Sequence, residues 1–486
     1  MYALQAMHTR NLIAGQWTDT GSGGEIEVVD PASDDVVARV PMCGASEALI
    51  ALNCAFEFQP KWEATPFTQR AGVLRAAAAM LIARKDSLAR LITQECGKPL
   101  PEAAGEVQYS ADYFSSAANE IHALDDMHIA LDKPGVRGVV RHRAVGVCAA
   151  ITPWNFPLAM LARKVAPALA AGCAQLAKPA EETPLCALAL AEILLECGLP
   201  PQCLHVLTGD AKAIATTWLM DGRVRKLSFT GSTETGRLLL RQCSQEIVRC
   251  SMELGGDAAF IVLADANIEL AVQSALQAKF RNAGQTCICP NRFLVHKDIA
   301  SEFAARMAIA AAQLKIAPGL EEGSNIGPLI HDEAVKKVRA HVADALKRGG
   351  KLVCGGRTKD MRDRPDRFFE PTVITNCNPN MLCFQDEIFG PVVAIMSVTS
   401  ADQALEIANA SPFGLAGYVF GGNHATALAV AQQLRCGVIG VNEAAPSNAR
   451  APFGGVKWSG YGREGGIWGL MEYVTTQYLA LRELNT

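Results

Sequence analysis

The sequence predicts an α/β protein with a Rossmann-like parallel sheet, a second α/β domain and a small extended segment. Short apolar runs alternate with helix-forming runs from about residue 145, and the alternation resumes near residue 256. Such alternation indicates right-handed βαβ crossovers and a parallel sheet covered by helices on both faces. The length agrees, because 486 residues suffice for about two or three domains.

The first α/β region begins with an apolar run, VGVCAAIT at 145–152, which predicts a buried strand, and the alanine- and leucine-rich run over about 158–171 predicts a helix. Pro184 and Gly198 bracket another helix, as proline starts and glycine ends helices. Further strands are predicted at 173–178, 203–207 and 226–232, and helices at 183–198, 211–221 and from about 234. Ligands of such sheets bind beyond the carboxyl ends of the strands.

The second α/β region is predicted to contain strands at 258–264 and 292–296, a helix at 267–280 and further helices to about 350. Two other segments lack this pattern. Residues 121–143 are poorly periodic and suggest an extended excursion, and YVTTQYLALREL near the C-terminus has strand-like content. Such segments either pair with another subunit or end as plain edge strands. The sequence therefore predicts a first unit formed by residues 1–120 and 144–255 and a second unit formed by residues 256–455. Extended segments are predicted at 121–143 and 456–486.

Composition excludes several classes. The net charge of -4 argues against a nucleic-acid partner, which would need a basic surface. The 16 cysteines are spread widely without a CxxC pair, and the N-terminus has no apolar signal core, so we expect reduced thiols in a cytoplasmic protein. The nine histidines include no HxxxH pair, so no metal site is expected.

One stretch could be mistaken for a membrane span. Residues 144–162 are free of charge over 19 positions, near the length of a spanning helix. However, Pro153, Asn155 and Pro157 interrupt it and would break helical hydrogen bonding in lipid. No membrane association is expected.

The sequence offers two candidate phosphate-binding turns. Gly460, Gly462 and Gly465 match GxGxxG, but no apolar strand precedes them and no βαβ unit follows, so this match is rejected. FTGSTETG at 229–236 runs from strand to helix and leaves main-chain amides free at a helix N-terminus. By itself this second signal is weak, because many βα turns carry glycine and a serine cap.

Polar residues stand out at several apolar sites. Asn155 in TPWNFP and Lys178 in LAKPAE each end a buried strand, although a capping asparagine in a turn would explain the first equally well. Glu253 in SMELGG lies in an apolar strand, where burial should raise its pKa toward that of a base working near neutral pH. Cys287 and Cys289 in RNAGQTCICPNR lie in a polar loop, unlike packed structural cysteines.

These clusters together resemble the motifs of the aldehyde dehydrogenase superfamily. The matching stretches are TPWNFP, KPAE, FTGSTETG, MELGGD, FRNAGQTCIC, EIFGPV and PFGGVKWSG, in that order, from about residue 150 to 460. The resemblance implies that the first unit binds NAD, the second is catalytic and the extended segments mediate oligomerisation. It also implies a homodimer or homotetramer.

The resemblance implies a catalytic set as well. Cys287 matches the nucleophile, whose thiolate would attack an aldehyde to give a thiohemiacetal and then a thioester. Asn155 and the Cys287 main-chain N–H match the groups that hold the oxyanion. Glu253 matches the base that activates water. A catalytically inactive family member acting as a binding or structural protein is the alternative, and the intact catalytic set argues against it.

Cofactor residues carry over in the same way. Lys178 and Glu181 match contacts to the adenosine ribose, and a carboxylate at 181 would repel a 2′-phosphate, so NAD is predicted and NADP stays the alternative. Ser232 matches a pyrophosphate contact. The full predicted cofactor set is Ile151, Thr152, Trp154, Lys178, Glu181, Gly209, Phe229, Gly231, Ser232, Glu387 and Phe389.

The substrate is expected to be a small semialdehyde carboxylic acid. Arg163, Arg281 and Ser447 match positions with which succinate-semialdehyde dehydrogenases hold the distal carboxylate, and two guanidinium groups can clamp a carboxylate. Each arginine by itself would more often be a surface or structural residue. The five-carbon glutarate semialdehyde is the near alternative, because one methylene gives only about 1–3 kcal/mol of discrimination.

Cys289 has two interpretations. It is either a packed small side chain, which is slightly favoured, or a redox partner of Cys287. Two residues apart in an extended loop, the Cα atoms span at most about 6.6 Å. That lies inside the usual disulfide range of roughly 4.4–6.8 Å, so a reversible Cys287–Cys289 bond is geometrically feasible.

Overall fold

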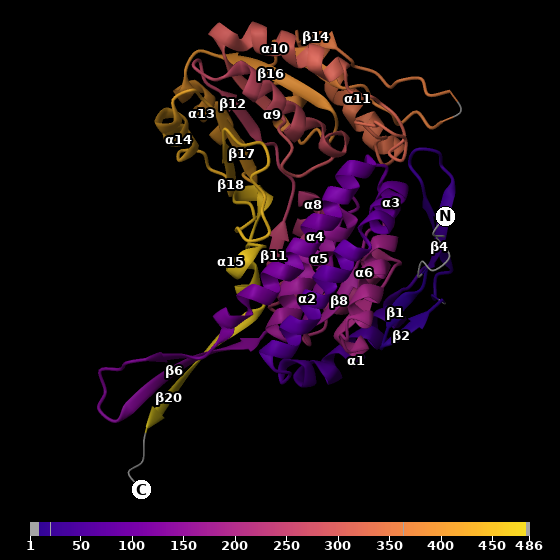
Figure 1. Ribbon diagram of the computed structural model, residues 1–486, viewed down its shortest axis with the longest axis vertical. Helices are drawn as coiled ribbons and strands as arrows, with labels where there is room; N and C mark the ends of the chain where they lie inside the picture. Colours follow the sequence, from indigo (N-terminus) through magenta and orange to yellow (C-terminus); the bar gives the residue numbers. More distant parts are fainter. Residues whose placement is uncertain (1–8, 20, 363, 483–486) are drawn as a thin grey trace.

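The computed structural model describes residues 9–19, 21–362 and 364–482. Two large sheets with their helices form the body of the molecule, one built mainly from the first half of the chain and one from the second (Figure 1). A thin antiparallel arm projects away from the first of them. The predicted α/β class, with a Rossmann-like parallel sheet and a second α/β unit, is confirmed.

The first large sheet has eight strands in the order β19-β11-β10-β7-β8-β9-β1-β2. Its strands are β1 (Asn11–Ile13), β2 (Gln16–Thr18), β7 (Val147–Ile151), β8 (Ala174–Lys178), β9 (Leu204–Val206), β10 (Val224–Thr230), β11 (Arg249–Glu253) and β19 (Gly460–Tyr461). The five central strands, β7 to β11, pair in parallel, and β1, β2 and β19 are antiparallel additions at the edges. The parallel pairing of these strands confirms the predicted parallel sheet.

Helices cover both faces of this sheet. They are α1 (Ala45–Glu63), α2 (Phe67–Ala83), α3 (Lys85–Cys96), α4 (Leu100–Glu120), α5 (Pro157–Ala171), α6 (Leu185–Glu196), α7 (Ala211–Leu219) and α8 (Thr233–Cys243). Helix α5 is buried along its whole length, because α2, α4 and α6 pack over it. Pro157 starts α5 and Gly172 ends it with a φ of 96°, a left-handed conformation that favours glycine.

The second large sheet has seven strands in the order β14-β15-β16-β13-β12-β17-β18. They are β12 (Ala259–Val262), β13 (Arg292–His296), β14 (Lys351–Cys354), β15 (Thr372–Thr375), β16 (Val392–Val398), β17 (Ala416–Phe420) and β18 (Val438–Val441). All pair in parallel except β14 with β15. The helices of this unit are α9 (Ile268–Phe280), α10 (Lys297–Ala312), α11 (Asp332–Lys347), α12 (Leu382–Gln385), α13 (Ala401–Asn409) and α14 (His424–Ala431).

The arm is a three-stranded antiparallel sheet in the order β20-β6-β5 (Figure 1). It consists of β5 (Met127–Ile129), β6 (Val136–Ala144) and β20 (Val474–Arg482), which join the predicted excursion to the predicted C-terminal strand. The short helix η4 (Lys457–Ser459) precedes β19, and α15 (Gly466–Met471) packs against α4 and α5 just before β20; a separate hairpin pairs β3 (Glu25–Val29) with β4 (Val36–Pro41). Residues 1–8 and 483–486 of the predicted segments lie outside the described residues, and the oligomeric role of the arm stays a prediction.

The charge-free stretch 144–162 is divided between elements. It holds the end of β6, all of β7, a turn containing Pro153 and the first part of α5. Throughout the described part of the chain, no helix combines the length and apolar character needed to cross a membrane.

Candidate active site

The loop that carries Cys287 leaves helix α9 through an unusual backbone turn. Asn282, Ala283 and Gly284 have φ values of 50°, 54° and 79°, all in the left-handed region. A Cβ atom on Gly284 would lie 2.2 Å from the Gly390 carbonyl oxygen, so only glycine fits against that strand connection. The turn therefore fixes the loop before it reaches the half-buried Cys287.

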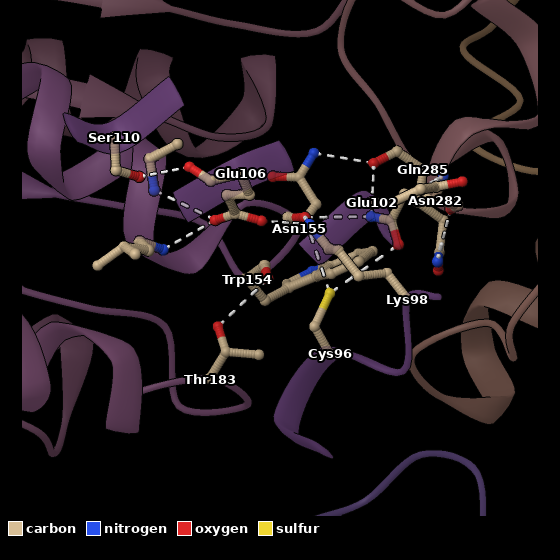
Figure 2. A network of polar contacts seen from close by, with 12 residues as sticks. Cys96, Lys98, Glu102, Glu106, Ser110, Trp154, Asn155, Thr183, Asn282 and Gln285 are labelled. Atoms are coloured by element: carbon tan, nitrogen blue, oxygen red, sulfur yellow. Dashed lines mark hydrogen bonds and ion pairs between the residues drawn. The ribbon is translucent and has the colours of Figure 1, made fainter. Parts of the chain in front are cut away.

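Asn155 lies against this loop at the start of α5, as Figure 2 shows. Its side-chain Nδ2 donates a hydrogen bond to the Gln285 carbonyl at 3.0 Å. Its own carbonyl accepts hydrogen bonds from Lys98 Nζ at 2.6 Å and from Asn282 Nδ2 at 3.1 Å. A carboxamide has two N–H donors, so one remains for a ligand beside the cysteine loop.

Glu253 ends strand β11 and is buried, with 3% of its surface exposed. Within the described residues neither carboxylate oxygen has a hydrogen-bond partner. Burial, followed by the nearby negative charge of Glu464, raises the pKa of Glu253 well above its usual value, while Arg163 and Lys164 oppose the shift. The predicted direction of this pKa shift is confirmed.

The Cys287 thiol responds to the same surroundings. Burial raises its pKa to about 12, Arg163 lowers it, and Glu387 and Glu253 raise it further. Because the charges of Glu253 and Arg163 both act on the Cys287 thiol, the three residues belong to one site. The thiol is therefore protonated near neutral pH in the ligand-free protein, and its reaction needs a proton acceptor.

Most predicted cofactor residues lie at the carboxyl ends of neighbouring strands. Ile151 ends β7 and Thr152 follows it, Lys178 ends β8, and Gly231 and Ser232 follow β10, whose Phe229 is buried. This is the edge where parallel sheets bind ligands. The Thr152 hydroxyl is buried and, in the part of the chain that is described, has no hydrogen-bond partner, so a bound ligand could satisfy it.

Two features of this edge suit a dinucleotide. The Ser232 side chain caps α8 by accepting from Thr235 N at 3.1 Å, which leaves earlier amides of the first turn to face an anion. Lys178 forms an ion pair with the half-exposed Glu181, so the two residues predicted to contact the adenosine ribose lie next to each other. Gly209, by contrast, approaches Cys43 so closely that a Cβ atom would lie 2.1 Å from the Cys43 carbonyl oxygen, which explains this glycine by packing.

The remaining predicted contacts come from both units. The Trp154 and Phe389 rings meet edge to face with centroids 5.6 Å apart. Glu387 Oε1 accepts a hydrogen bond from Gly256 N at 3.2 Å, and burial raises the pKa of Glu387 to about 7. These residues bridge the two units close to the cysteine loop.

The predicted substrate arginines differ from each other. Arg163 is buried, its Nε lies 2.6 Å from Glu464 Oε2, and its guanidinium packs over the Phe453 ring at 4.2 Å. The Nε–H is not aligned for a hydrogen bond, so this contact is ionic in character. Arg281 stacks over the Phe156 ring at 4.7 Å and makes no ion pair with any carboxylate of the described residues.

Ser447 and Cys289 also have defined places. Ser447 Oγ lies 2.5 Å from the Tyr109 hydroxyl, which in turn lies 2.6 Å from the Tyr113 hydroxyl. Arg163 packs over the Tyr113 ring at 5.1 Å, so Ser447 and Arg163 belong to one connected polar cluster. The Cys289 thiol is buried and lies 3.5 Å from the Lys279 carbonyl, and both it and Cys287 are free thiols.

Sequence reasoning missed three groups of this site. Glu464 lies inside the rejected GxGxxG stretch, and its signal was a charged residue among glycines. The only sequence signal for Tyr109 was a second tyrosine, Tyr113, one helical turn later in α4. Lys98 gave no signal beyond its place before a proline and the start of α4.

Comparisons with known proteins identify the family of the chain. The model of the aldehyde dehydrogenase family matches residues 17–479. The chain is 42% identical to the succinate-semialdehyde dehydrogenase [NADP(+)] of Escherichia coli (strain K12), over 97% of both chains, and 41% identical to the glutarate-semialdehyde dehydrogenase of Pseudomonas putida, over 98% of both. The crystal structure of succinate-semialdehyde dehydrogenase from Burkholderia pseudomallei superposes with a TM-score of 0.97 at 42% identity, covering 99% of this chain and 100% of that one. The chain belongs to the aldehyde dehydrogenase family.

Proposed function

We propose that this protein is an NAD-dependent dehydrogenase that oxidises succinate semialdehyde to succinate at Cys287. The observation that carries the proposal is the position of Arg281, six residues before the nucleophile, with a guanidinium that pairs with no carboxylate of the described chain. Glu102 is near enough for the charge of Arg281 to oppose the rise in its pKa that burial causes, but it forms no ion pair with Arg281 among the described residues. A half-buried guanidinium without an ion-pair partner, six residues before the nucleophile, favours a substrate that carries its own negative charge. The similarity to semialdehyde dehydrogenases supports the same substrate class.

The chemistry follows from the placement of the side chains. Glu253, as a carboxylate, accepts the Cys287 thiol proton and releases it to solvent, Cys287 Sγ attacks the aldehyde carbon, and the carbonyl electron pair moves to oxygen. The free N–H of Asn155 and the Cys287 main-chain N–H stabilise that oxyanion. Bound NAD would supply the hydride acceptor, and loss of hydride leaves a thioester on Cys287.

Glu253 completes the reaction. As a carboxylate it takes a proton from a water molecule, whose oxygen attacks the thioester carbon; the C–S bond breaks and the acid leaves. Its raised pKa makes the carboxylate a stronger base than an exposed glutamate. Its burial without a hydrogen-bond partner in the described residues leaves both oxygens able to accept from that water.

Arg281 is the primary anchor for the distal carboxylate in this proposal, and Ser447 with Tyr109 adds hydroxyl donors. Arg163 contributes less than a free guanidinium, because Glu464 already neutralises it. Glutarate semialdehyde is the second candidate substrate, supported by the similarity to the Pseudomonas putida enzyme. One extra methylene changes binding by only about 1–3 kcal/mol.

The cofactor preference belongs to the proposal as well. Glu181 supports NAD, since its carboxylate would repel a 2′-phosphate. The E. coli relative named for NADP(+) makes NADP the alternative. We also expect a homodimer or homotetramer, formed through the arm, in the cytoplasm.

Steady-state assays test the proposal directly. Formation of the reduced cofactor is measured with succinate semialdehyde, glutarate semialdehyde and butanal, each with NAD and with NADP. The highest kcat/KM is expected for succinate semialdehyde with NAD. Equal kcat/KM for butanal would rule out an acid-specific enzyme, and equal values for the two cofactors would rule out the NAD preference.

A further inference from the structure

Lys98 and Glu106 form an ion pair in the interior of the first unit. Both side chains are 0% exposed, and Lys98 Nζ lies 2.5 Å from Glu106 Oε2. Among the described residues neither side chain forms a hydrogen bond or ion pair with the cysteine loop, yet both lie in the network around Asn155 (Figure 2). A buried ion pair is costly to desolvate and adds little stability compared with an apolar pair, so its presence calls for a reason.

The pair holds one short segment at both ends. Lys98 Nζ donates to the Asn155 carbonyl at 2.6 Å and lies 3.8 Å from the centre of the Phe156 ring. Glu106 Oε1 accepts from Leu158 N at 2.9 Å and Ala159 N at 3.1 Å, which are the first free amides of α5. The backbone from 155 to 159 is thus fixed by one lysine and one glutamate that are themselves paired.

Capping α5 does not require the lysine. Glu95 caps the neighbouring helix α6 in the same way, accepting from Leu185 N at 2.8 Å and Cys186 N at 3.0 Å, and it forms no ion pair with any described residue. A buried glutamate can therefore cap a helix in this fold by itself. Lys98 must be explained by its other contacts.

Satisfying the Asn155 carbonyl does not require the lysine either. The oxygen has two lone pairs and also accepts from Asn282 Nδ2 at 3.1 Å, with the Cys96 thiol at 3.7 Å. What Lys98 adds is a short, charge-assisted bond that connects the Asn155 main chain, through the ion pair with Glu106, to α4. The Asn155 side chain, on the same residue, reaches the cysteine loop at Gln285.

We propose that the Lys98–Glu106 pair is a positioning device that holds the Asn155 amide at the place where the oxyanion forms. This inference rests on the proposed role of Asn155 as an oxyanion donor. Lys98 does not touch the reacting atoms and acts through Asn155. The expectation is quantitative, because a misplacement of about 1 Å costs roughly 10²-fold in rate and loss of one oxyanion donor costs about 10²–10³-fold.

Two reactions of Cys287 separate positioning from general damage. Acylation by p-nitrophenyl acetate passes through an oxyanion: sulfur bonds to the ester carbon and p-nitrophenolate leaves. Alkylation by iodoacetamide displaces iodide from a saturated carbon and forms no oxyanion. Lys98→Met, which is close in size and lacks the donor, should slow acylation about 10–100-fold and leave the alkylation rate within about twofold of the wild type.

Matched variants sharpen the test. Glu95→Gln, which alters the equivalent cap of α6, should leave the ratio of the two rates unchanged. In an Asn155→Ala background Lys98→Met should have no further effect on acylation, because the two residues act through one donor. The double variant Lys98→Met/Glu106→Gln keeps the buried pair neutral and should show the same selective loss if Lys98→Met folds poorly.

Three results would overturn the inference. The first is an equal loss of the acylation and alkylation rates in Lys98→Met. The second is a loss of acylation rate from Lys98→Met that adds in full to the loss from Asn155→Ala. The third is a wild-type ratio of acylation to alkylation rates in folded Lys98→Met/Glu106→Gln. Neither reagent needs a cofactor or a semialdehyde. Failure of the wild type to oxidise succinate semialdehyde would therefore reject the proposed substrate without affecting this test.

Discussion

Arg163 Nε lies 2.6 Å from Glu464 Oε2, and at most 5% of either side chain is exposed. Lys164 lies 2.6 Å from the other oxygen of the same carboxylate. Burial raises the pKa of Glu464, but the charges of Lys164 and Arg163 outweigh burial and lower it, so this carboxylate is ionised near neutral pH. One of the two arginines of the predicted clamp therefore already has an ion-pair partner. Arg281 forms no ion pair with any described residue, although its charge opposes the rise in pKa that burial causes in Glu102.

Arg281→Ala should impair acidic substrates selectively. A hydrogen bond to a charged group contributes about 1.5–3 kcal/mol, so KM for succinate semialdehyde should rise roughly 10–100-fold. Butanal has no distal charge, and its kcat/KM should stay within about twofold. Steady-state kinetics on both aldehydes measure the difference, and parallel losses on both would show that Arg281 does not contact the carboxylate.

Arg163→Met should act mainly on stability. Removing one partner of a buried ion pair costs roughly 3–5 kcal/mol, and the loss here should lie near or below the lower end because Lys164 still pairs with Glu464. The melting temperature should fall, and it should fall further in Arg163→Met/Glu464→Gln, because that second change leaves the buried Lys164 ammonium without its carboxylate. If Arg163→Met melts like the wild type but has a lower kcat/KM for succinate semialdehyde and not for butanal, Arg163 is a substrate anchor after all.

The sequence predicted the elements around the site better than the contacts within it. Strands β7 to β10 were predicted within about two residues, because their apolar runs are continuous and their flanking helices are clear. Asn155, Lys178 and Glu253 were singled out because polar residues rarely end apolar strands. The partners of these residues could not be predicted: Lys164 and Glu464 are 300 positions apart, and Lys98 reaches Asn155 only through the packing of α4 on α5.

Alkylation of Cys287 should depend steeply on pH. Its pKa is raised to about 12 by burial, so the thiolate fraction should grow about tenfold for each pH unit between roughly pH 7 and 9. Because 16 cysteines are present, the rate is followed by peptide mass spectrometry of the loop after iodoacetamide treatment. A rate that reaches half its maximum near pH 8.5 and levels off above about pH 9.5, the behaviour of an ordinary thiol, would contradict the raised pKa.

Glu181→Gln should improve the use of NADP. The side chain is 42% exposed, so its repulsion of a 2′-phosphate is screened, and removing the charge should raise kcat/KM for NADP by about threefold to tenfold. The value for NAD should change less, since an amide still hydrogen-bonds to ribose hydroxyls. Initial rates with both cofactors give the ratio. An unchanged ratio would show that Glu181 does not select the cofactor.

The last prediction concerns Cys289, which should form a reversible disulfide with Cys287 under oxidising conditions. Hydrogen peroxide can oxidise two thiols to one disulfide, with two water molecules formed, and a bond from Cys289 to Cys287 would remove the nucleophile reversibly. In the structure the Cys289 thiol is buried and contacts the carbonyls of Lys279 and Pro290, which it would have to leave. We expect dithiothreitol to restore the wild type after peroxide treatment but not Cys289→Ala, whose Cys287 would proceed to irreversible oxidation. Activity after reduction and the mass of the loop peptide measure both outcomes; equal recovery of the two proteins would leave Cys289 as a packing residue.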